Sequence, residues 1–304
     1  MDWTEGIQRA IDYIEAHITE PLDYDAIARE AYASGYHFQR VFGILCGWTL
    51  GEYIRNRRLA LAGEEQQADG AKVIDTALKY GYDSPDSFAR AFQKFHGVTP
   101  SQARGGATLK SFSRLRVKVS LEGGYSMNYR IESKPEMILT GYGRRFEGAP
   151  GGRMAQEADF TMRTRPQQYL LMGLDSFENM PRSASVVMNV TDDGFDFCLG
   201  RFLSEKARDG MASEYALGPE YAALFRHIVI PAHTYAVFET ERCTYPTEVF
   251  LDLRAQVVSE WLPSSGWQLA DAAEITLYHW MGGEKREERY IELWMPVEPA
   301  RAGN

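Results

Sequence analysis

The stretch from Tyr32 to Thr49 constrains the fold of this chain most, because its pattern returns fifty residues later. The two copies share seven identities: Tyr32 with Tyr82, Ser34 with Ser84, Phe38 with Phe88, Arg40 with Arg90, Phe42 with Phe92, Gly47 with Gly97 and Thr49 with Thr99. Chance would give about one identity in a window of this length. The match predicts an internal duplication of one structural unit.

Each copy has the pattern of a capped helix preceded by a shorter one. A serine suited to cap a helix precedes two phenylalanines spaced by four, which places both rings on one helix face. Because the arginine lies two residues from each ring, we expect Arg40 and Arg90 to point into solvent. Shorter helical patterns precede the copies at Ile27–Ala31 and Ile74–Leu78. Each pair predicts a helix-turn-helix, and the alternative is an αα-hairpin that serves packing alone.

The run from Ile7 to Arg104 resembles the DNA-binding domain of the AraC/XylS family of transcription regulators, most closely its MarA/Rob-like members. The motifs are HFQRVF at His37–Phe42, GWTLGEYIRNRRL at Gly47–Leu59, ALKYGYDSPDSFARAFQKFHGVTP at Ala77–Pro100 and the closing Arg104. The resemblance implies two motifs in successive major grooves, held by a connecting helix. The sequence supplies about 18 residues of good helix formers from Thr49 to Gln66, or roughly 27 Å. Tyr32 departs from the family, because many relatives have glycine there.

Candidate DNA contacts follow from the chemistry of the exposed positions. Arg40 and Gln39 are the expected base readers, since arginine pairs with guanine and glutamine with adenine in the major groove, and Tyr36 adds a supporting contact. The alternatives are a phosphate contact for Arg40 and a solvated surface for Gln39. Further candidates are Arg55, Arg57 and Arg58 in YIRNRRL, and Ser84, Ser87 and Arg90 in the second motif.

The two motifs are not expected to read DNA equally. The second opens with Ser84-Pro85-Asp86. Proline has no side-chain donor, and phosphates repel a carboxylate. We therefore expect a sharp half-site under the first motif and a degenerate one under the second.

The net charge of −9 over 304 residues does not by itself indicate DNA binding. Up to Lys110 the chain has 12 basic and 15 acidic residues, so the placement of the arginines has to supply the phosphate contacts. No run of about 18 apolar residues occurs, and MDWTEGIQRA is not a signal sequence. We expect a cytoplasmic protein without a membrane partner.

After Leu109 the period of the apolar pattern changes from helical to alternating. LRVKVSL at Leu115–Leu121 predicts a half-buried strand. Further strand patterns are MNYRIE, MILTGYGRRF, ASVVMNV, HTYAVFET, ITLYHWM and YIELWMPV, and Thr247–Trp261 has a helical apolar stripe. These patterns predict an α+β domain with a mostly antiparallel sheet.

The second half, about Met127 to Val297, resembles the GyrI-like effector-binding domain of Rob-type and BmrR-type regulators. The motifs are IPAHTYAVFETE at Ile230–Glu241, EWLPSSGWQL at Glu260–Leu269 and ELWMPV at Glu292–Val297. The resemblance implies a pseudo-twofold fold with a central cleft for small hydrophobic or cationic molecules. One departure is Thr276, where the family often has glutamate.

A carboxylate beside aromatic rings suits a hydrophobic cation, so Glu292 is the predicted charge partner of the effector. Strand alternation places Glu292 on the same face as Trp294. The other predicted ligand contacts are Tyr235, Trp261, Trp267, Tyr278, Trp280 and Trp294. The alternative is a solvent-exposed glutamate at a strand edge, with the tryptophans as ordinary core.

We therefore expect an N-terminal all-α DNA-binding domain at 1–108, a linker at 109–126 and a GyrI-like domain at 127–304. The expected function is a ligand-responsive transcription regulator, an activator that binds asymmetric promoter DNA as a monomer and works with RNA polymerase, without a cofactor or metal. We expect no enzyme. The alternatives are a GyrI-like hydrolase using Glu292, Tyr278 and His279, and a ligand-independent architectural DNA binder.

Overall fold

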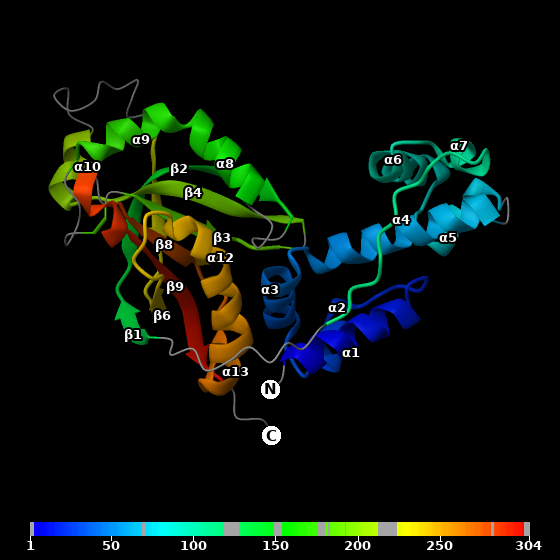
Figure 1. Ribbon diagram of the computed structural model, residues 1–304, viewed down its shortest axis with the longest axis horizontal. Helices are drawn as coiled ribbons and strands as arrows, with labels where there is room; N and C mark the ends of the chain where they lie inside the picture. Colours follow the sequence, from blue (N-terminus) through cyan, green and yellow to red (C-terminus); the bar gives the residue numbers. More distant parts are fainter. Residues whose placement is uncertain are drawn as a thin grey trace. The chain divides into compact units, whose positions relative to one another are not determined.

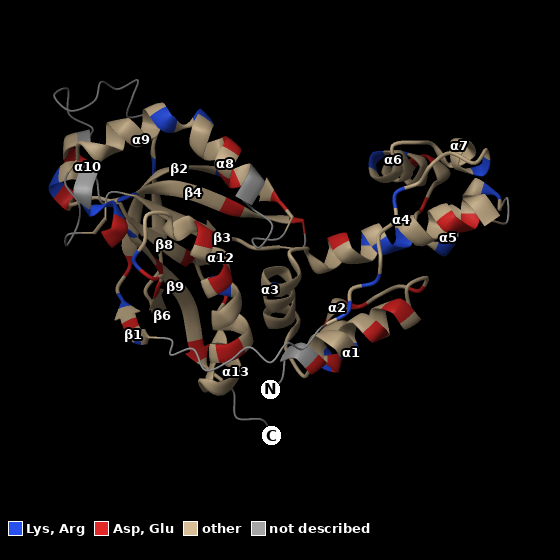
Figure 2. Cartoon of the chain, viewed as in Figure 1, with Lys and Arg blue, Asp and Glu red and all other residues tan. Residues whose placement is uncertain are grey.

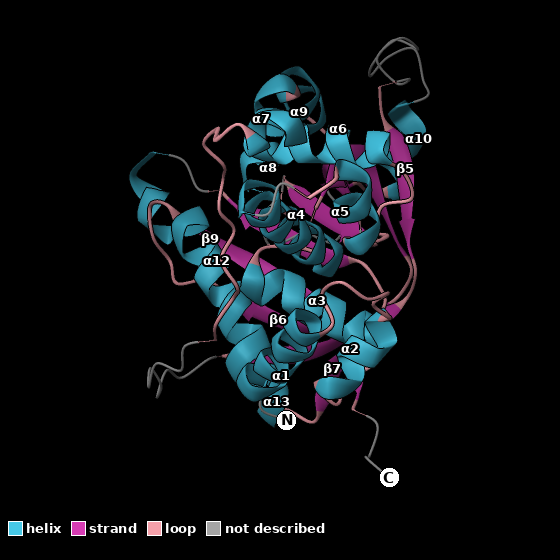
Figure 3. Cartoon of the chain, turned by 90° about the vertical axis from the view of Figure 1, so that its right-hand side faces the viewer, coloured by secondary structure: helices cyan, strands magenta, loops and turns pink. Residues whose placement is uncertain are grey.

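The computed structural model describes residues 3–68, 71–117, 128–148, 154–174, 180–181, 183–191, 193–211, 224–280 and 283–300. The chain divides into two compact units, one made mainly of residues up to Leu121 and the other mainly of residues from Glu122 onward. Among the described residues, the first unit is helical and the strands belong to the second (Figure 3). None of the described helices is both long and apolar enough to cross a membrane.

The first unit consists of two helix-turn-helix pairs joined by a long helix (Figure 1). Its helices are α1 (Trp3–Ala16), α2 (Tyr24–Glu30), α3 (Gly35–Cys46), α4 (Leu50–Ala68), α5 (Val73–Lys79), α6 (Pro85–His96) and α7 (Pro100–Arg104). Phe38, Phe42, Phe88 and Phe92 are fully buried, as their spacing predicts. The predicted duplication and connecting helix are confirmed.

The turns that follow α2 and α5 have the same hydrogen-bond pattern. Ala33 and Tyr82 each donate their backbone N–H to the carbonyl five residues earlier, at 3.0 and 2.9 Å. The residue before each is left-handed, with φ of 53° at Tyr32 and 80° at Gly81, a conformation that favours glycine. Tyr32 therefore corresponds to Gly81 in structure and not to Tyr82, and the second turn has one extra residue before its serine.

The strand predicted from Leu115 is wrong over the residues that are described. Leu115–Val117 has no regular structure and lies against α1 and α4. The Leu115 N–H donates to the Tyr53 hydroxyl at 3.4 Å, and the Val117 N–H donates to Gln8 Oε1 at 3.0 Å. The rest of the predicted strand, 118–121, lies outside the described residues.

The second unit is built on one antiparallel sheet with the strand order β1-β6-β9-β8-β3-β4-β2-β5. Its strands are β1 (Tyr129–Lys134), β2 (Met137–Glu147), β3 (Ala184–Met188), β4 (Gly194–Phe202), β5 (Arg226–Ile230), β6 (His233–Glu239), β8 (Glu274–His279) and β9 (Tyr290–Pro299), while β7 (Trp267–Leu269) pairs with β9. The helical elements are α8 (Met154–Arg163), α9 (Arg165–Met172), α10 (Glu205–Met211), α12 (Pro246–Gln256), η3 (Val257–Trp261), α13 (Leu262–Ser264) and η4 (Gly283–Glu288).

The strand order repeats in mirror sequence about the central pair β3 and β8. In chain order, β2, α8 with α9, β3 and β4 correspond to β6, α12 with η3, β8 and β9. The outer strands β5 and β1 pair with β2 and β6 in the two halves. The predicted pseudo-twofold antiparallel sheet is confirmed.

Side chains from both halves show that α8 and α12 pack on the same face of the sheet. Phe160 of α8 contacts Phe197 at a ring separation of 6.0 Å. Arg254 of α12 makes a buried two-bond ion pair with Glu274, at 2.8 and 3.0 Å. Phe197 pairs with Val187, and Val187 pairs with Glu274, so these side chains share one face.

Candidate DNA-contacting surface and ligand pocket

Helix α3 begins after Ser34, whose hydroxyl accepts the His37 N–H at 3.4 Å. Gln39 and Tyr36 are half-buried on this helix. Arg40 is only 5% exposed, and its Nη1 donates to the Tyr36 hydroxyl at 3.0 Å. The expectation of a solvent-exposed Arg40 is therefore wrong, and its guanidinium contacts Tyr36 one turn earlier on the same helix.

Helix α6 begins with a serine cap that uses two of the predicted DNA contacts. Ser84 Oγ accepts the Ser87 N–H at 3.2 Å, and the Ser87 hydroxyl donates to the Ser84 carbonyl at 2.9 Å. Pro85 takes the first helical position, where its missing N–H is not needed. Arg90 is exposed, as predicted. Of the three residues predicted in this motif, Arg90 is the one with a side chain not used in the cap.

The arginines of α4 differ in their surroundings. Figure 2 shows basic residues in the middle of α4 and acidic residues along α1. Arg55 is exposed. Arg58 donates to the carbonyls of Ile18 and Glu20, at 2.8 and 2.6 Å. Arg58 therefore connects α4 to the end of the α1 segment, and its predicted use on phosphates is not supported.

Arg57 is also held inside the first unit. Its Nε and Nη2 donate to the two oxygens of Glu15, at 2.8 and 2.7 Å, and its Nη1 donates to the Phe112 carbonyl. Both side chains are nearly buried, at 11% and 12% exposure. Burial alone would raise the Glu15 pKa, but hydrogen bonds from Arg57 and Tyr53 hold that pKa below its usual value. Arg57 thus joins α1, α4 and the chain segment after α7, and its predicted phosphate contact is not supported.

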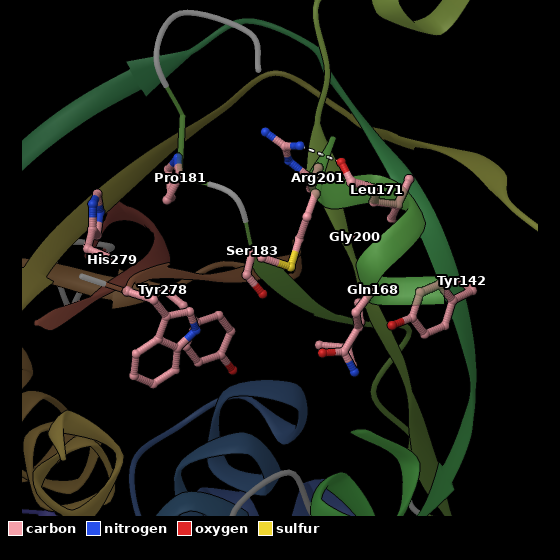
Figure 4. A pocket seen from close by; sticks show the side chains of 12 residues that line it. Tyr142, Gln168, Leu171, Pro181, Ser183, Gly200, Arg201, Tyr278 and His279 are labelled. Carbon is pink, nitrogen blue, oxygen red and sulfur yellow. Dashed lines mark hydrogen bonds between the residues drawn. The ribbon is translucent and has the colours of Figure 1, made fainter. Parts of the chain in front are cut away.

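The second unit contains a pocket of about 550 Å³ (Figure 4). It lies on the sheet face that the helices cover, beside α9 and strands β2, β3, β4 and β8. Its lining residues are Tyr142, Gln168, Leu171, Met172, Pro181, Ser183, Leu199, Gly200, Arg201, Tyr278, His279 and Trp280. The volume suits a drug-sized molecule, and the wall is mostly aromatic and aliphatic.

One wall of the pocket is an aromatic pair from the end of β8. Tyr278 and Trp280 stack with ring centroids 5.6 Å apart and planes only 9° from parallel. The Tyr278 hydroxyl bonds Ser185 at 3.0 Å and donates to Glu157 of α8 at 3.1 Å. Trp280 is 46% exposed, so its indole is accessible to a ligand.

The other predicted ligand contacts do not line this pocket. Trp261 packs on Phe238, with ring centroids 5.0 Å apart. Tyr235 is fully buried beside Trp294, and Trp267 begins β7. These aromatic residues belong to the core and to the sheet, so the prediction that they form the ligand wall is wrong for this pocket.

Glu292 does not line the pocket either, and its carboxylate already has partners within the unit. It accepts hydrogen bonds from Trp294 Nε1 at 2.7 Å and Arg130 Nη2 at 3.1 Å. Burial alone would raise the Glu292 pKa, but bonds from His279 and Trp294 and the charge of Arg130 lower that pKa. Glu292 shares a face with Trp294 as predicted, yet the cation beside it is Arg130. The exposed-edge alternative is also wrong, since Glu292 is 7% exposed on an inner strand.

Sequence reasoning did not find several residues of the pocket. Gln168 and Leu171 come from α9, a region with weak family motifs, Tyr142 comes from a predicted strand, and Arg201 comes from β4, which was not predicted from the sequence. Thr276, the predicted departure from the family, is 1% exposed and pairs with Ser185.

The residues considered for hydrolysis do not converge on one point. Tyr278 and His279 are neighbours on β8 and therefore face opposite sides of the sheet. His279 Nε2 lies 3.4 Å from Glu292, while the Tyr278 hydroxyl contacts Ser185. Within the described part of the chain, no cluster of three histidine, cysteine or acidic side chains is placed to hold a metal.

Comparisons with known proteins match each unit separately. Residues 27–106 match the model of a helix-turn-helix domain, and residues 130–297, more than half of the chain, match the integron-associated effector binding protein family. The HTH-type transcriptional activator AarP of Providencia stuartii is 43% identical over 98 residues, 32% of this chain and 73% of that protein. The regulatory protein SoxS of Salmonella typhimurium is 40% identical over 104 residues, 34% of this chain and 97% of that protein.

A solved structure is also similar to part of the chain. SAV2435 bound to tetraphenylphosphonium matches with 19% identity and a TM-score of 0.42, over 57% of this chain and 94% of that one. The AarP and SoxS matches lie in the helix-turn-helix region, and the effector-binding match lies in the sheet unit. The chain is a ligand-responsive, DNA-binding transcription regulator that belongs to the AraC-type helix-turn-helix family through its first unit and to the integron-associated effector binding protein family through its second.

Proposed function

We propose that the protein is a transcriptional activator that binds asymmetric promoter DNA as a monomer through α3 and α6. The observation that carries this proposal is the pair of serine-capped helices in one unit, joined by the 19-residue α4. Such a helix is about 28 Å long, near the ~34 Å spacing of adjacent major-groove faces. The similarity to AarP, which is named a transcriptional activator, supports the sign of regulation.

The proposed base readers are Gln39 and Arg40 on α3, with Arg90 on α6 and Arg55 as a phosphate contact. Arg40 has to leave the Tyr36 hydroxyl to reach a guanine, where it can make a bidentate base contact. Because Ser84 and Ser87 form the cap of α6, base reading under the second motif depends on Arg90.

A selection experiment on random DNA tests the proposed contacts. We expect one sharp half-site, which loses preference at one base position in Arg40→Ala, and one degenerate half-site, which loses its remaining preference in Arg90→Ala. Two equally sharp half-sites, or an unchanged sequence preference in Arg40→Ala, would contradict these assignments. Transcription with purified RNA polymerase tests the sign, because an activator raises transcript yield from a promoter that contains the selected site.

The proposed effector site is the pocket beside Tyr278 and Trp280. The stacked pair and the volume of about 550 Å³ support binding of an aromatic molecule. A ligand that stacks on the exposed Trp280 should change tryptophan fluorescence, and Trp280→Phe should remove most of that change. Product formation from a bound molecule would support the hydrolase alternative instead, and DNA binding that no small molecule alters would support the architectural one.

A further inference from the structure

The charges in the pocket wall do not match the expected cationic ligand. Among the described lining residues there is no aspartate or glutamate, and the permanently charged one is Arg201. Arg201 comes from β4 and is 2% exposed. Its Nη1 donates to the carbonyls of Leu171 and Leu174, at the end of α9, which holds the guanidinium at one end of the pocket (Figure 4).

Two further ionisable groups lie near this wall. His279 follows Tyr278 at the end of β8 and is a lining residue, but its ring faces the opposite side of the sheet from Tyr278, where Nε2 lies 3.4 Å from Glu292. Glu157 is not among the described lining residues, and its carboxylate accepts a hydrogen bond from the Tyr278 hydroxyl at 3.1 Å. Among the described lining residues, the charged side chain on the same sheet face as Tyr278 is therefore Arg201.

The aromatic and charged parts of the pocket are complementary to one class of molecule. The stacked faces of Tyr278 and Trp280 suit a flat ring system, and a guanidinium favours a carboxylate through charge-assisted hydrogen bonds. A cation would approach the buried charge of Arg201, and repulsion is strong where water is partly excluded.

We infer that the effector is an anionic aromatic molecule, of the arene carboxylate class, and that Arg201 recognises its negative charge. This inference rests on the proposed effector site. Arg201 thus takes the role in charge selectivity that was expected of Glu292, whose carboxylate already binds Arg130.

The test uses the full chain and three ligands of one shape: naphthoate, naphthamide and naphthylmethylammonium. Affinities come from calorimetry and from the change in tryptophan fluorescence. We expect naphthoate to bind at least about tenfold more tightly than naphthamide, and the ammonium compound to bind most weakly. Equal affinities, or tightest binding of the ammonium compound, would overturn the inference while keeping the pocket as the effector site. Failure of all three to bind would overturn both the inference and the proposed site.

Three variants test whether Arg201 or Glu157 determines the charge selectivity. Arg201→Lys keeps the charge and should keep the preference for naphthoate, whereas Arg201→Gln should bring naphthoate to the level of naphthamide. Because Arg201 bonds α9, circular dichroism and thermal melting must show that each variant is folded, and the wild-type order of affinities is decisive if Arg201→Gln is not. Glu157→Gln should leave the order unchanged, and a specific loss of ammonium binding in that variant would assign charge recognition to Glu157.

Discussion

Replacing Arg57 by alanine distinguishes a DNA contact from a structural ion pair. The guanidinium makes two bonds to Glu15 and one to the Phe112 carbonyl, and the Tyr53 hydroxyl donates to the same carboxylate at 2.8 Å. Truncation leaves Glu15 nearly buried without its cation and removes the donor of the Phe112 carbonyl. The segment after α7 then loses one of its attachments to α4.

The size of the effect follows from the burial of the pair. Breaking a buried ion pair by removing one partner costs roughly 3–5 kcal/mol. Glu15 keeps the bond from Tyr53 and is 12% exposed, so we expect the lower end, about 3 kcal/mol. A loss of this size lowers the melting temperature of a domain of this length by on the order of 15 °C.

The pH dependence has a defined sign. The Glu15 pKa is lowered in the folded state, so its contribution to stability is present at neutral pH and is lost as the pH falls through the acidic range. The difference between wild type and Arg57→Ala should therefore shrink toward low pH. Scanning calorimetry of the full chain at several pH values measures this directly.

Arg55→Ala is the matched control, because Arg55 is an exposed arginine on the same helix. We expect its free energy of unfolding to stay within about 0.5 kcal/mol of wild type. The slope of log K for DNA binding against log salt concentration should fall by about one, as for the loss of one phosphate contact. Arg57→Ala, assayed at a temperature where it is folded, should keep the wild-type salt dependence. An Arg57→Ala variant with normal stability and a reduced salt dependence would refute the structural role.

Three other substitutions have defined outcomes. Tyr32→Gly should raise the free energy of unfolding by about 0.5 kcal/mol, because glycine adopts the left-handed backbone at this position without strain. This gain exceeds the loss of the Tyr32 ring that stacks on Arg9. Urea titration of Tyr32→Gly and Tyr32→Ala measures the difference. Burial lowers the pKa of His96, so the neutral ring favours the folded state and stability should fall as the pH drops below about 6.5. His96→Gln should flatten that dependence in melts between neutral and mildly acidic pH. Glu274→Ala should destabilise the second unit by about 4 kcal/mol, and adding Arg254→Met should restore part of the loss, as measured by thermal melting.

The helical unit could be predicted from sequence because its signals are local. Two phenylalanines four residues apart, preceded by a serine, determine both the buried face and the start of α3 and α6. The same rule failed for Arg40. Its guanidinium contacts the Tyr36 hydroxyl, and helical spacing does not predict how a long side chain is oriented.

The false strand at Leu115 has a comparable cause. Alternation of apolar and basic residues predicts a strand only if a neighbouring strand satisfies the backbone. Here the N–H groups of Leu115 and Val117 are satisfied by side chains of Tyr53 and Gln8, which come from α4 and α1. Those partners are more than sixty residues away in sequence, so the pattern could not reveal them.

The pocket was the least predictable part, because its composition depends on strand register across the sheet. Alternation correctly placed Glu292 and Trp294 on one face, but it could not identify which face the helices cover. The pairing of β8 with β9 puts Leu277 opposite Glu292, so Tyr278 faces the other side, toward α8 and Glu157. A carboxylate and an aromatic residue from neighbouring strands can therefore look like one site in sequence and lie on opposite faces. Arg201 was overlooked because no strand was predicted at Gly194–Phe202, and the carbonyls at the end of α9 that hold its guanidinium are about thirty residues away in sequence.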